Sequence, residues 1–385
     1  MKKLSPLDYA KMSCDAIMHK YAPEDLPPKN AFFYIQGVFL SGMQRVYLET
    51  GEKKYFEYIK KYVDSLIGEN GELPGINREY TFKNEVEGGY RHLQLLDCKQ
   101  PTILLYNLFD ETGEQKYINA IKTVGESMYY WPVNSVGGYW HMMTQIDQMW
   151  MDGAYMAGPL SVMYAERFGA PIIRERAIEQ ILIMNKYMRD SKTGLYFHGW
   201  DESRKSAWAD PETGLSSQIW GRAVAWYAVA ILDVLDYIPK EHPKVEELKR
   251  IECDLLSNLS KYQHKETGMW CEVLDKPYED RNWSESSATN LILYSYAKAS
   301  RLGIVEKNAY ADIIERGYEA TISTTFMDEE GYLIVDKICE GTCIDEGTYE
   351  HYINRRTRQN DLHGCGAFVL MCVEMEKYIK QKPAL

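Results

Sequence analysis

The sequence of 385 residues predicts an all-α protein whose six inner and six outer helices form an (α/α)6 barrel. Apolar residues recur at helical spacing in successive segments, and strongly apolar segments alternate with segments that are apolar on one face only. Successive strongly apolar segments lie roughly 55 to 75 residues apart, whereas tetratricopeptide and HEAT repeats need about 34 to 47. Six hairpins closed into a ring therefore fit better than an open solenoid. No Pro/Ser-rich linker interrupts the chain, so we expect a single domain over residues 1–385.

The inner helices are the segments richest in Gly, Ala and large apolar residues, which we expect to be buried: 31–49, 101–111, 148–168, 217–238, 286–300 and 364–379. The outer helices are more charged and alternate with them along the chain: 7–20, 54–67, 116–130, 174–188, 244–262 and 310–324. The repeated ETGE at 49–52 and 111–114 predicts a C-cap glycine and then an acidic first turn. Each copy should therefore join two helices by a tight turn.

Four outer helices are followed by long connections with a shared pattern. Each has a Gly and then an aromatic or apolar pair, as in VGGYWHMM, KTGLYFHGWD, ETGMWCEVLD and EEGYLIVDK. The pattern predicts a turn and a short extended piece. Because these loops lie at the same end of the hairpins and lead into inner helices, they should surround one mouth of the barrel, where we expect the functional residues.

Composition narrows the class of partner. The net charge of −12 argues against nucleic acid or an anionic membrane as the main partner, but not against a small anionic substrate. No run of about 18 apolar residues predicts a membrane span, and no apolar run near the N-terminus predicts a signal peptide. Eight scattered cysteines without a CxxC pair favour free thiols in a reducing cytoplasm. Without a phosphate-binding glycine loop, GxSxG or HExxH motif, we expect no cofactor and no metal.

Asp152 lies in DQMWMDGAYM (147–156), among methionines and aromatic residues. An acid near a helix start is most often a cap or first-turn residue. The apolar residues on both sides instead suggest that it points from an inner helix towards the barrel axis. A desolvated carboxyl there would have a raised pKa and could act as a general acid. Both interpretations remain open.

Asp97 precedes Pro101 by four residues, so it can be a plain acid of the cap region. It is also a second acid on the same predicted rim. Two carboxylates at one site can divide into a protonated and an ionised group, which is what a glycosidase requires.

Histidines precede several of the predicted inner helices. His92 and His141 come before the second and third, His198 lies in YFHGW before the fourth, and His363 in DLHGCGAF before the sixth. The ordinary alternative for His198 is a half-buried ring bonded to a loop carbonyl. The common position at the rim makes His141, His198 and His363 candidate functional residues.

Arg222 lies in the otherwise apolar run IWGRAVAWYAVAIL, where an unpaired cation is costly. It needs an acidic partner, either an internal carboxylate or the carboxylate of a substrate. Trp220, two residues earlier, should point from a different face of the helix. The two therefore form no obvious patch in the sequence.

The segments GGYWHMM, QMWMDGAYM, GLYFHGWD, QIWGRAVAWY and DLHGCGAF, in this order, resemble glycoside hydrolase family 105, the unsaturated rhamnogalacturonyl hydrolases. The resemblance covers most of the chain. It implies an (α/α)6 barrel, a cytoplasmic location, Asp152 as general acid/base and Asp97 as its partner. It also implies substrate contacts at His141, His198, Trp220 and Arg222, to which we add His363 and Met156. The LLDCKQPT stretch around Asp97 resembles the family less than the other segments do.

The implied substrate is a short pectin (rhamnogalacturonan) oligosaccharide with a Δ4,5-unsaturated uronic acid at its non-reducing end. Protonation of this vinyl ether at C4 gives a cation at C5, to which water adds, and the resulting hemiketal expels the aglycone. Three alternatives stay open. The first is the same chemistry on unsaturated glucuronyl units of other polyuronates. The second is a non-catalytic sugar-binding protein in which Asp152 and Arg222 form a structural ion pair, and the third is an isomerase or epimerase on the same barrel.

Overall fold

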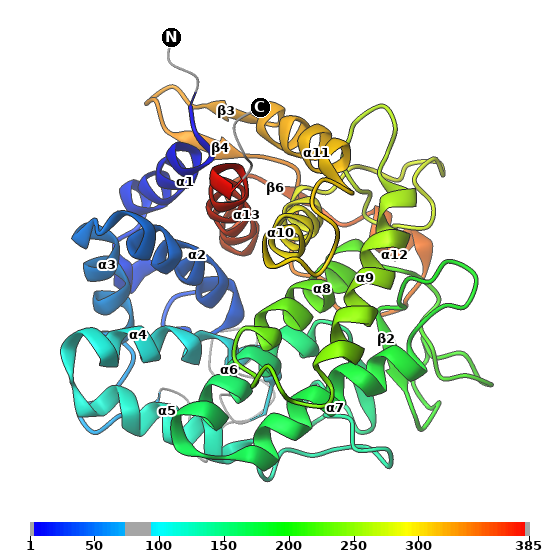
Figure 1. The fold of residues 1–385 in the computed structure, drawn as a ribbon, viewed down its shortest axis with the longest axis horizontal. Helices are drawn as coiled ribbons and strands as arrows, with labels where there is room; N and C mark the ends of the chain where they lie inside the picture. The colour runs from blue at the N-terminus through cyan, green and yellow to red at the C-terminus, as the bar shows by residue number, and fades with distance from the viewer. Residues whose placement is uncertain (1–3, 74–93, 382–385) are drawn as a thin grey trace.

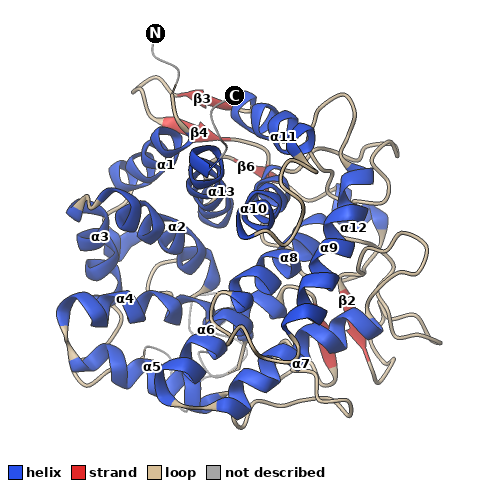
Figure 2. Cartoon of the chain, viewed as in Figure 1, coloured by secondary structure: helices blue, strands red, loops and turns tan. Residues whose placement is uncertain are grey.

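The computed structural model describes residues 4–73 and 94–381, and the helices in these ranges form two concentric rings (Figures 1 and 2). The inner ring consists of α2 (Tyr34–Thr50), α4 (Ile103–Thr112), α6 (Gly153–Phe168), α8 (Gly221–Leu235), α10 (Ser286–Leu302) and α13 (Leu362–Gln381). The outer ring consists of α1 (Pro6–Lys20), α3 (Lys53–Asp64), α5 (Gln115–Ser127), α7 (Pro171–Tyr187), α9 (Val245–Leu259) and α11 (Ala311–Ser323). Every predicted helical segment overlaps the helix expected there.

The inner ring is closed. Its helices pack in chain order from α2 to α13, and α13 packs back against α2. This closing contact is close, because a Cβ at Gly366 of α13 would lie 2.6 Å from the backbone nitrogen of Phe39 on α2. Buried apolar residues of both rings form one continuous hydrophobic core. The prediction of an all-α (α/α)6 barrel is therefore confirmed.

The two ETGE repeats form the predicted turns. Gly51 ends α2 and Gly113 ends α4, each in the left-handed conformation at φ 70°. This conformation strains residues with a Cβ and suits glycine. Each turn leads within two residues into the next outer helix, α3 or α5.

Short strands lie in the long connections, and residues 199–201 and 333–335 form strands within two of the four segments that carry the Gly-containing pattern. β1 (Gln148–Trp150) pairs antiparallel with β2 (Gly199–Asp201), so that two successive hairpins are joined at the mouth. The other pairs are β3 (Thr325–Met327) with β4 (Leu333–Val335), and β5 (Ile338–Cys339) with β6 (Thr357–Arg358). The sequence did not predict the short helix α12 (Tyr349–Ile353) or the 3-10 turns η1 (Pro23–Asp25), η3 (Leu96–Cys98), η4 (Gln100–Thr102) and η5 (Ser260–Tyr262).

The third inner helix begins later than predicted. Residues 148–150 form strand β1, and α6 begins only at Gly153. The cause is non-local, because the backbone of this stretch pairs with residues 199–201 of the next hairpin. Similarly, α8 begins at Gly221, and Trp220 before it pairs with Val273. Both differences lie where the functional residues cluster.

Two further findings concern membrane-spanning helices and disulfide bonds. No helix in the described ranges is long and apolar enough to cross a lipid bilayer. The eight cysteines all lie in the described ranges, and none of them forms a disulfide there.

Candidate active site

Asp152 occupies the N-cap position of α6, but its side chain does not cap the helix. Instead, its Oδ2 lies 3.2 Å from Nε2 of His198. The strand pair explains this contact, because Asp152 follows β1 and His198 precedes β2, and the Met151 amide donates to the His198 carbonyl at 2.9 Å. Asp152 is therefore held against an imidazole from the next hairpin.

Tyr352 fixes the orientation of His198. Its hydroxyl lies 2.7 Å from His198 Nδ1, and both residues are buried. Burial and the nearby Asp152 raise the pKa of Tyr352, so its hydroxyl remains protonated and donates to Nδ1. His198 then carries its own proton on Nε2, which faces Asp152.

Asp97 and His141 form a second acid–imidazole pair. Asp97 lies in η3, just before α4, and its Oδ2 is 3.4 Å from His141 Nε2. The His141 ring stacks on Trp150 at 4.6 Å between ring centroids, and Trp150 meets the His198 ring edge to face at 5.8 Å. Trp150 therefore connects the two pairs.

Trp220 and Arg222 lie on the other side of His198. The Trp220 ring is 4.6 Å from the His198 ring, and the guanidinium of Arg222 lies 4.5 Å above the Trp220 ring. The expectation that the two side chains diverge is wrong, because Trp220 has extended backbone angles and stands outside the helix. Its indole N–H donates to Glu272 Oε1 at 2.8 Å.

Arg222 donates to the backbone carbonyls of Cys339 and Glu340, at 2.7 and 2.9 Å. Within the part of the chain that the structure describes, Arg222 forms no ion pair, and Asp152 pairs with His198 rather than with Arg222. His363 also reaches the Cys339 carbonyl, at 3.0 Å from Nε2, while its Nδ1 lies 2.9 Å from Asp361 Oδ1.

The expectation of a raised pKa for Asp152 is wrong. Burial raises the pKa of this carboxyl, but the His198 N–H and the nearby His141 and Arg222 favour the ionised form and outweigh burial, so the pKa is lowered. Burial also lowers the pKa of His198 although Asp152 opposes it, so the ring is neutral at pH 7. The flanking Met149 and Met151 belong to the hydrophobic core. Polar neighbours therefore set the charge of Asp152.

Seven of the predicted site residues lie in one continuous cluster: Asp97, His141, Asp152, His198, Trp220, Arg222 and His363. The side chains of Asp152 and Asp97 are 13% and 14% exposed, whereas those of His141 and His198 are 3% and 0% exposed. The carboxylates therefore form the solvent-facing side of the cluster. Met156 is buried in α6, one turn after Asp152, and belongs to the hydrophobic core. His92 lies outside the described residues.

Sequence reasoning missed three residues of this cluster: Trp150, Glu272 and Tyr352. Trp150 stands two residues before Asp152, and its place on a strand explains its direction. Burial and nearby Glu285 raise the pKa of Glu272 to about 8, so it is mostly protonated at neutral pH. Tyr352 comes from the short α12, 154 positions after His198, and no spacing pattern links the two.

The model of Glycosyl Hydrolase Family 88 matches residues 9–379. The chain belongs to Glycosyl Hydrolase Family 88. This family 88 protein is therefore a glycoside hydrolase, as predicted.

Solved and curated relatives of this family 88 hydrolase agree with that placement. A glycoside hydrolase of family 105 from C. acetobutylicum has a TM-score of 0.87 and 29% identity, and the match covers 97% of this chain and 99% of the other. The unsaturated rhamnogalacturonyl hydrolase YesR of Bacillus subtilis is 25% identical over 320 residues, 80% of this chain and 79% of YesR. The unsaturated 3S-rhamnoglycuronyl hydrolase of Alteromonas sp. is 24% identical over 309 residues, 78% of this chain and 70% of that protein. The resemblance to family 105 is confirmed.

Proposed function

We propose that this glycoside hydrolase removes the Δ4,5-unsaturated uronic acid from the non-reducing end of lyase-generated rhamnogalacturonan oligosaccharides. The observation that carries the proposal is the Asp152–His198 pair, 3.2 Å apart, with a partly exposed carboxylate beside Trp220 and Arg222. The similarity to YesR and to the family 105 structure supports the substrate class.

The reaction is hydration of a vinyl ether. Asp152 gives a proton to C4, which leaves a cation at C5 next to the ring oxygen. Asp152, now ionised, takes a proton from the water that attacks C5. The hemiketal formed at C5 rearranges and expels the aglycone sugar, so the anomeric carbon is not attacked.

Asp152 must gain a proton before this step, because it is ionised in the ligand-free protein. The substrate brings its own carboxylate, and a second negative charge beside Asp152 raises its pKa. Asp152 therefore takes up its proton as the substrate binds. Asp97, held by His141, lies on the same exposed side and acts as its partner.

We assign the remaining polar groups of the cluster to substrate binding. Arg222 supplies the positive charge for the uronate carboxylate, and the buried Trp220 ring, which contacts both Arg222 and His198, holds these two groups in place for the unsaturated ring. His141, His198 and His363 surround these groups, and Met156 contributes an apolar contact. The glycosidase chemistry itself depends on Asp152.

The test replaces Asp152 by Asn. With unsaturated rhamnogalacturonan disaccharide as substrate, the ultraviolet absorbance of the conjugated double bond should decay with the natural chain. In Asp152→Asn we expect kcat/KM to fall by roughly 10² to 10⁴ or more while the melting temperature changes little. Asp147→Asn is the matched control, since its carboxylate stands on the same segment and its φ of 61° suits Asn. Activity of Asp152→Asn equal to that of the control refutes the assignment.

The second candidate is the same reaction on other unsaturated uronyl substrates, and the similarity to the Alteromonas 3S-rhamnoglycuronyl hydrolase favours it. A panel of unsaturated disaccharides separates the two candidates. Its members are of rhamnogalacturonyl or glucuronyl type and carry different aglycones. The higher kcat/KM identifies the substrate. Absence of turnover on the whole panel would refute both candidate substrates.

A further inference from the structure

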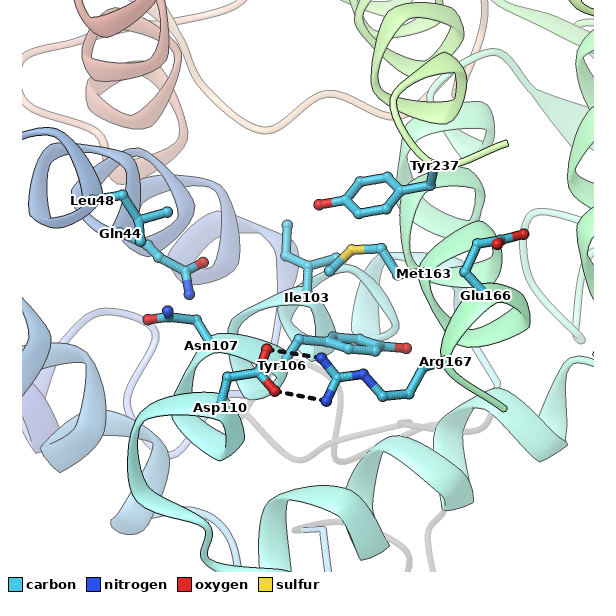
Figure 3. Close-up of a pocket in the computed structure, with 10 residues that line it drawn as sticks. All are labelled: Gln44, Leu48, Ile103, Tyr106, Asn107, Asp110, Met163, Glu166, Arg167 and Tyr237. Atoms are coloured by element: carbon cyan, nitrogen blue, oxygen red, sulfur yellow. Dashed lines mark hydrogen bonds and ion pairs between the residues drawn. The ribbon is translucent and has the colours of Figure 1, made fainter. Parts of the chain in front are cut away.

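A second cavity lies at the end of the barrel opposite the candidate active site. Its volume is about 450 Å³, within the range typical of small-molecule sites. The walls come from the C-terminal halves of α2 and α6, from α4 and from Tyr237 just after α8 (Figure 3). Asp152 precedes the first residue of α6 and Arg167 is near its last, so the two sites are roughly 20 Å apart along this helix.

The cavity continues inward. A smaller cavity of about 240 Å³ shares five lining residues with it, namely Gln44, Leu48, Ile103, Met163 and Tyr237. None of these residues belongs to the cluster around Asp152 and His198. The two adjoining cavities therefore form a site separate from the proposed catalytic one.

Several polar groups on the wall have hydrogen-bonding capacity that the protein does not use. The Tyr106 hydroxyl is buried and has no hydrogen-bond partner within residues 4–73 and 94–381, in a side chain that is only 4% exposed. The side chains of Gln44, Asn107 and Tyr237 also make no hydrogen bond to the described residues, and the two amides face the same space in Figure 3. The buried Tyr106 hydroxyl is costly without a partner, whereas the half-buried amides of Gln44 and Asn107 and the exposed Tyr237 hydroxyl are free to bind a ligand in the cavity.

The wall also has an apolar side. Leu48, Ile103 and Met163 line the space together with the rings of Tyr106 and Tyr237. Amides and phenols both donate and accept hydrogen bonds, and aromatic rings offer flat apolar faces. A molecule that fits such a wall has many hydroxyl groups around a ring with apolar C–H faces.

The charges around the cavity are already paired. Arg167 forms a bidentate ion pair with Asp110 at 2.7 and 2.8 Å, and Glu166 pairs with Arg174 at 3.0 Å. In the inner part, Arg45 pairs with Asp233 at 2.9 Å. No unpaired cation among the described lining residues is available for an anion, which argues for an uncharged ligand.

We propose that this cavity, which we call the distal cavity, binds a neutral saccharide of one or two rings. The proposal does not depend on which substrate the candidate active site hydrolyses. The described residues that line the distal cavity include no carboxylate–imidazole pair, so we assign it as a binding site and not a second reaction centre.

The test is a ligand-observed NMR titration of the full chain with D-galactose, D-glucose and L-rhamnose as neutral probes and D-glucuronate as the anionic probe. We expect at least one neutral sugar to bind with a Kd in the millimolar range, and Asp152→Asn to bind it equally well. Asn107→Leu should weaken this binding at least tenfold, because it removes the amide and keeps the volume. Its hydrolytic activity should be unchanged.

Tyr106→Phe is the sharper variant. It removes only the unpartnered hydroxyl, so the ligand-free protein should melt at the same or a higher temperature while sugar binding weakens several-fold. A purely structural role of Tyr106 predicts the reverse. The proposal is overturned if no neutral sugar binds, or if Asn107→Leu and Tyr106→Phe bind the sugar as tightly as the natural chain does. It is also overturned if Asp152→Asn abolishes sugar binding. A fourth refuting outcome is that glucuronate binds at least as tightly as the neutral sugars, with the same dependence on Asn107. Loss of hydrolysis alone, with sugar binding kept, bears only on the proposed function.

Discussion

The hydroxyl of Tyr352 determines which nitrogen of His198 carries the proton, and through it the charge state of Asp152. In Tyr352→Phe, the imidazole can adopt the other tautomer and present a lone pair to the carboxylate. The pKa of Asp152 then rises, because the His198 N–H, which lowers this pKa more than any other group, no longer faces the carboxylate. We expect kcat/KM to fall roughly tenfold, and the limb of the pH profile that reports Asp152 in the free enzyme to move to higher pH.

A pH–rate profile of both proteins on one unsaturated disaccharide checks this. Tyr349→Phe is the matched control, because Tyr349 lies on the same short helix α12 and its hydroxyl donates to the Asp280 carbonyl. A fall in rate without any shift of the limb would mean that Tyr352 only supports the fold.

Lys99 is a second buried group whose pKa departs from its ordinary value. It is fully buried, with Nζ 2.8 Å from the Ser127 hydroxyl and over the Trp131 ring, and burial lowers its pKa to about 7. Because an unfolded Lys has a pKa near 10.4, the unfolded chain binds more protons between these values, and stability rises with pH from about 7 to 10.

Lys99→Met should therefore stabilise the protein by roughly 2 kcal/mol at pH 7, with a gain that shrinks towards pH 10. Chemical denaturation at several pH values measures it. Lys186→Met, at an exposed position of α7, should show neither effect. A gain for Lys99→Met that does not change with pH would exclude the titration as its cause.

At the scale of elements, the contact between α13 and α2 closes the ring, and Gly366 allows it. A Cβ at this position would come within 2.6 Å of the Phe39 nitrogen and the Val38 carbonyl carbon, both backbone atoms of α2. Backbone cannot rotate away as a flexible side chain can, so Gly366→Ala must separate the two helices. We expect a loss of about 1 to 3 kcal/mol in unfolding free energy.

Thermal or chemical unfolding followed by circular dichroism measures this loss. The control is Gly341→Ala, since a Cβ there would meet only the Tyr34 hydroxyl at 3.9 Å. Equal stability of the two variants would show that the ring tolerates a wider contact.

The helices could be predicted from the sequence because they are determined by residues close together in the chain. Apolar spacing and the ETGE turns are properties of neighbouring residues, and the helices lie where these patterns indicate them. The start of α6 was not predictable, because residues 148–150 form a strand only in the presence of residues 199–201. The site shows the same division. Asp152, His198 and Arg222 stand out as polar residues in apolar runs, whereas Tyr352 and the lowered pKa of Asp152 depend on contacts between distant segments.

At the scale of the whole molecule, a buried ion cluster joins three inner helices at the end opposite the candidate active site. Lys298 of α10 lies 2.6 Å from Asp233 of α8 and 2.5 Å from Asp236, and Arg45 of α2 lies 2.9 Å from Asp233. Burial raises the pKa of Asp233, but Lys298 and Arg45 outweigh it and lower that pKa. The cluster therefore contributes stability that is present above the ordinary Asp pKa near 3.9 and is lost as the pH falls below it.

Lys298→Met breaks this cluster and leaves Asp233 with Arg45 and the Tyr294 hydroxyl. We expect a loss of about 3 to 5 kcal/mol at pH 7 and a smaller loss below pH 4, measured by denaturation at both pH values. Lys377→Met is the control, because its pair with Glu49 is partly exposed and should contribute no more than about 1 kcal/mol. Equal losses for the two variants would mean that the buried cluster does not tie the helices together.

The antiparallel pair β1–β2 has a consequence for how the sequence can change over evolution. Facing side chains alternate along a strand, so an insertion or deletion of one residue between Gln148 and Asp152 would turn Asp152 away from His198. A substitution in the same stretch changes only one side chain and leaves the register intact. Natural variants should therefore differ in residue type along 148–152 and 198–201 while the number of residues stays constant, and changes in chain length should collect in connections that carry no such pairing.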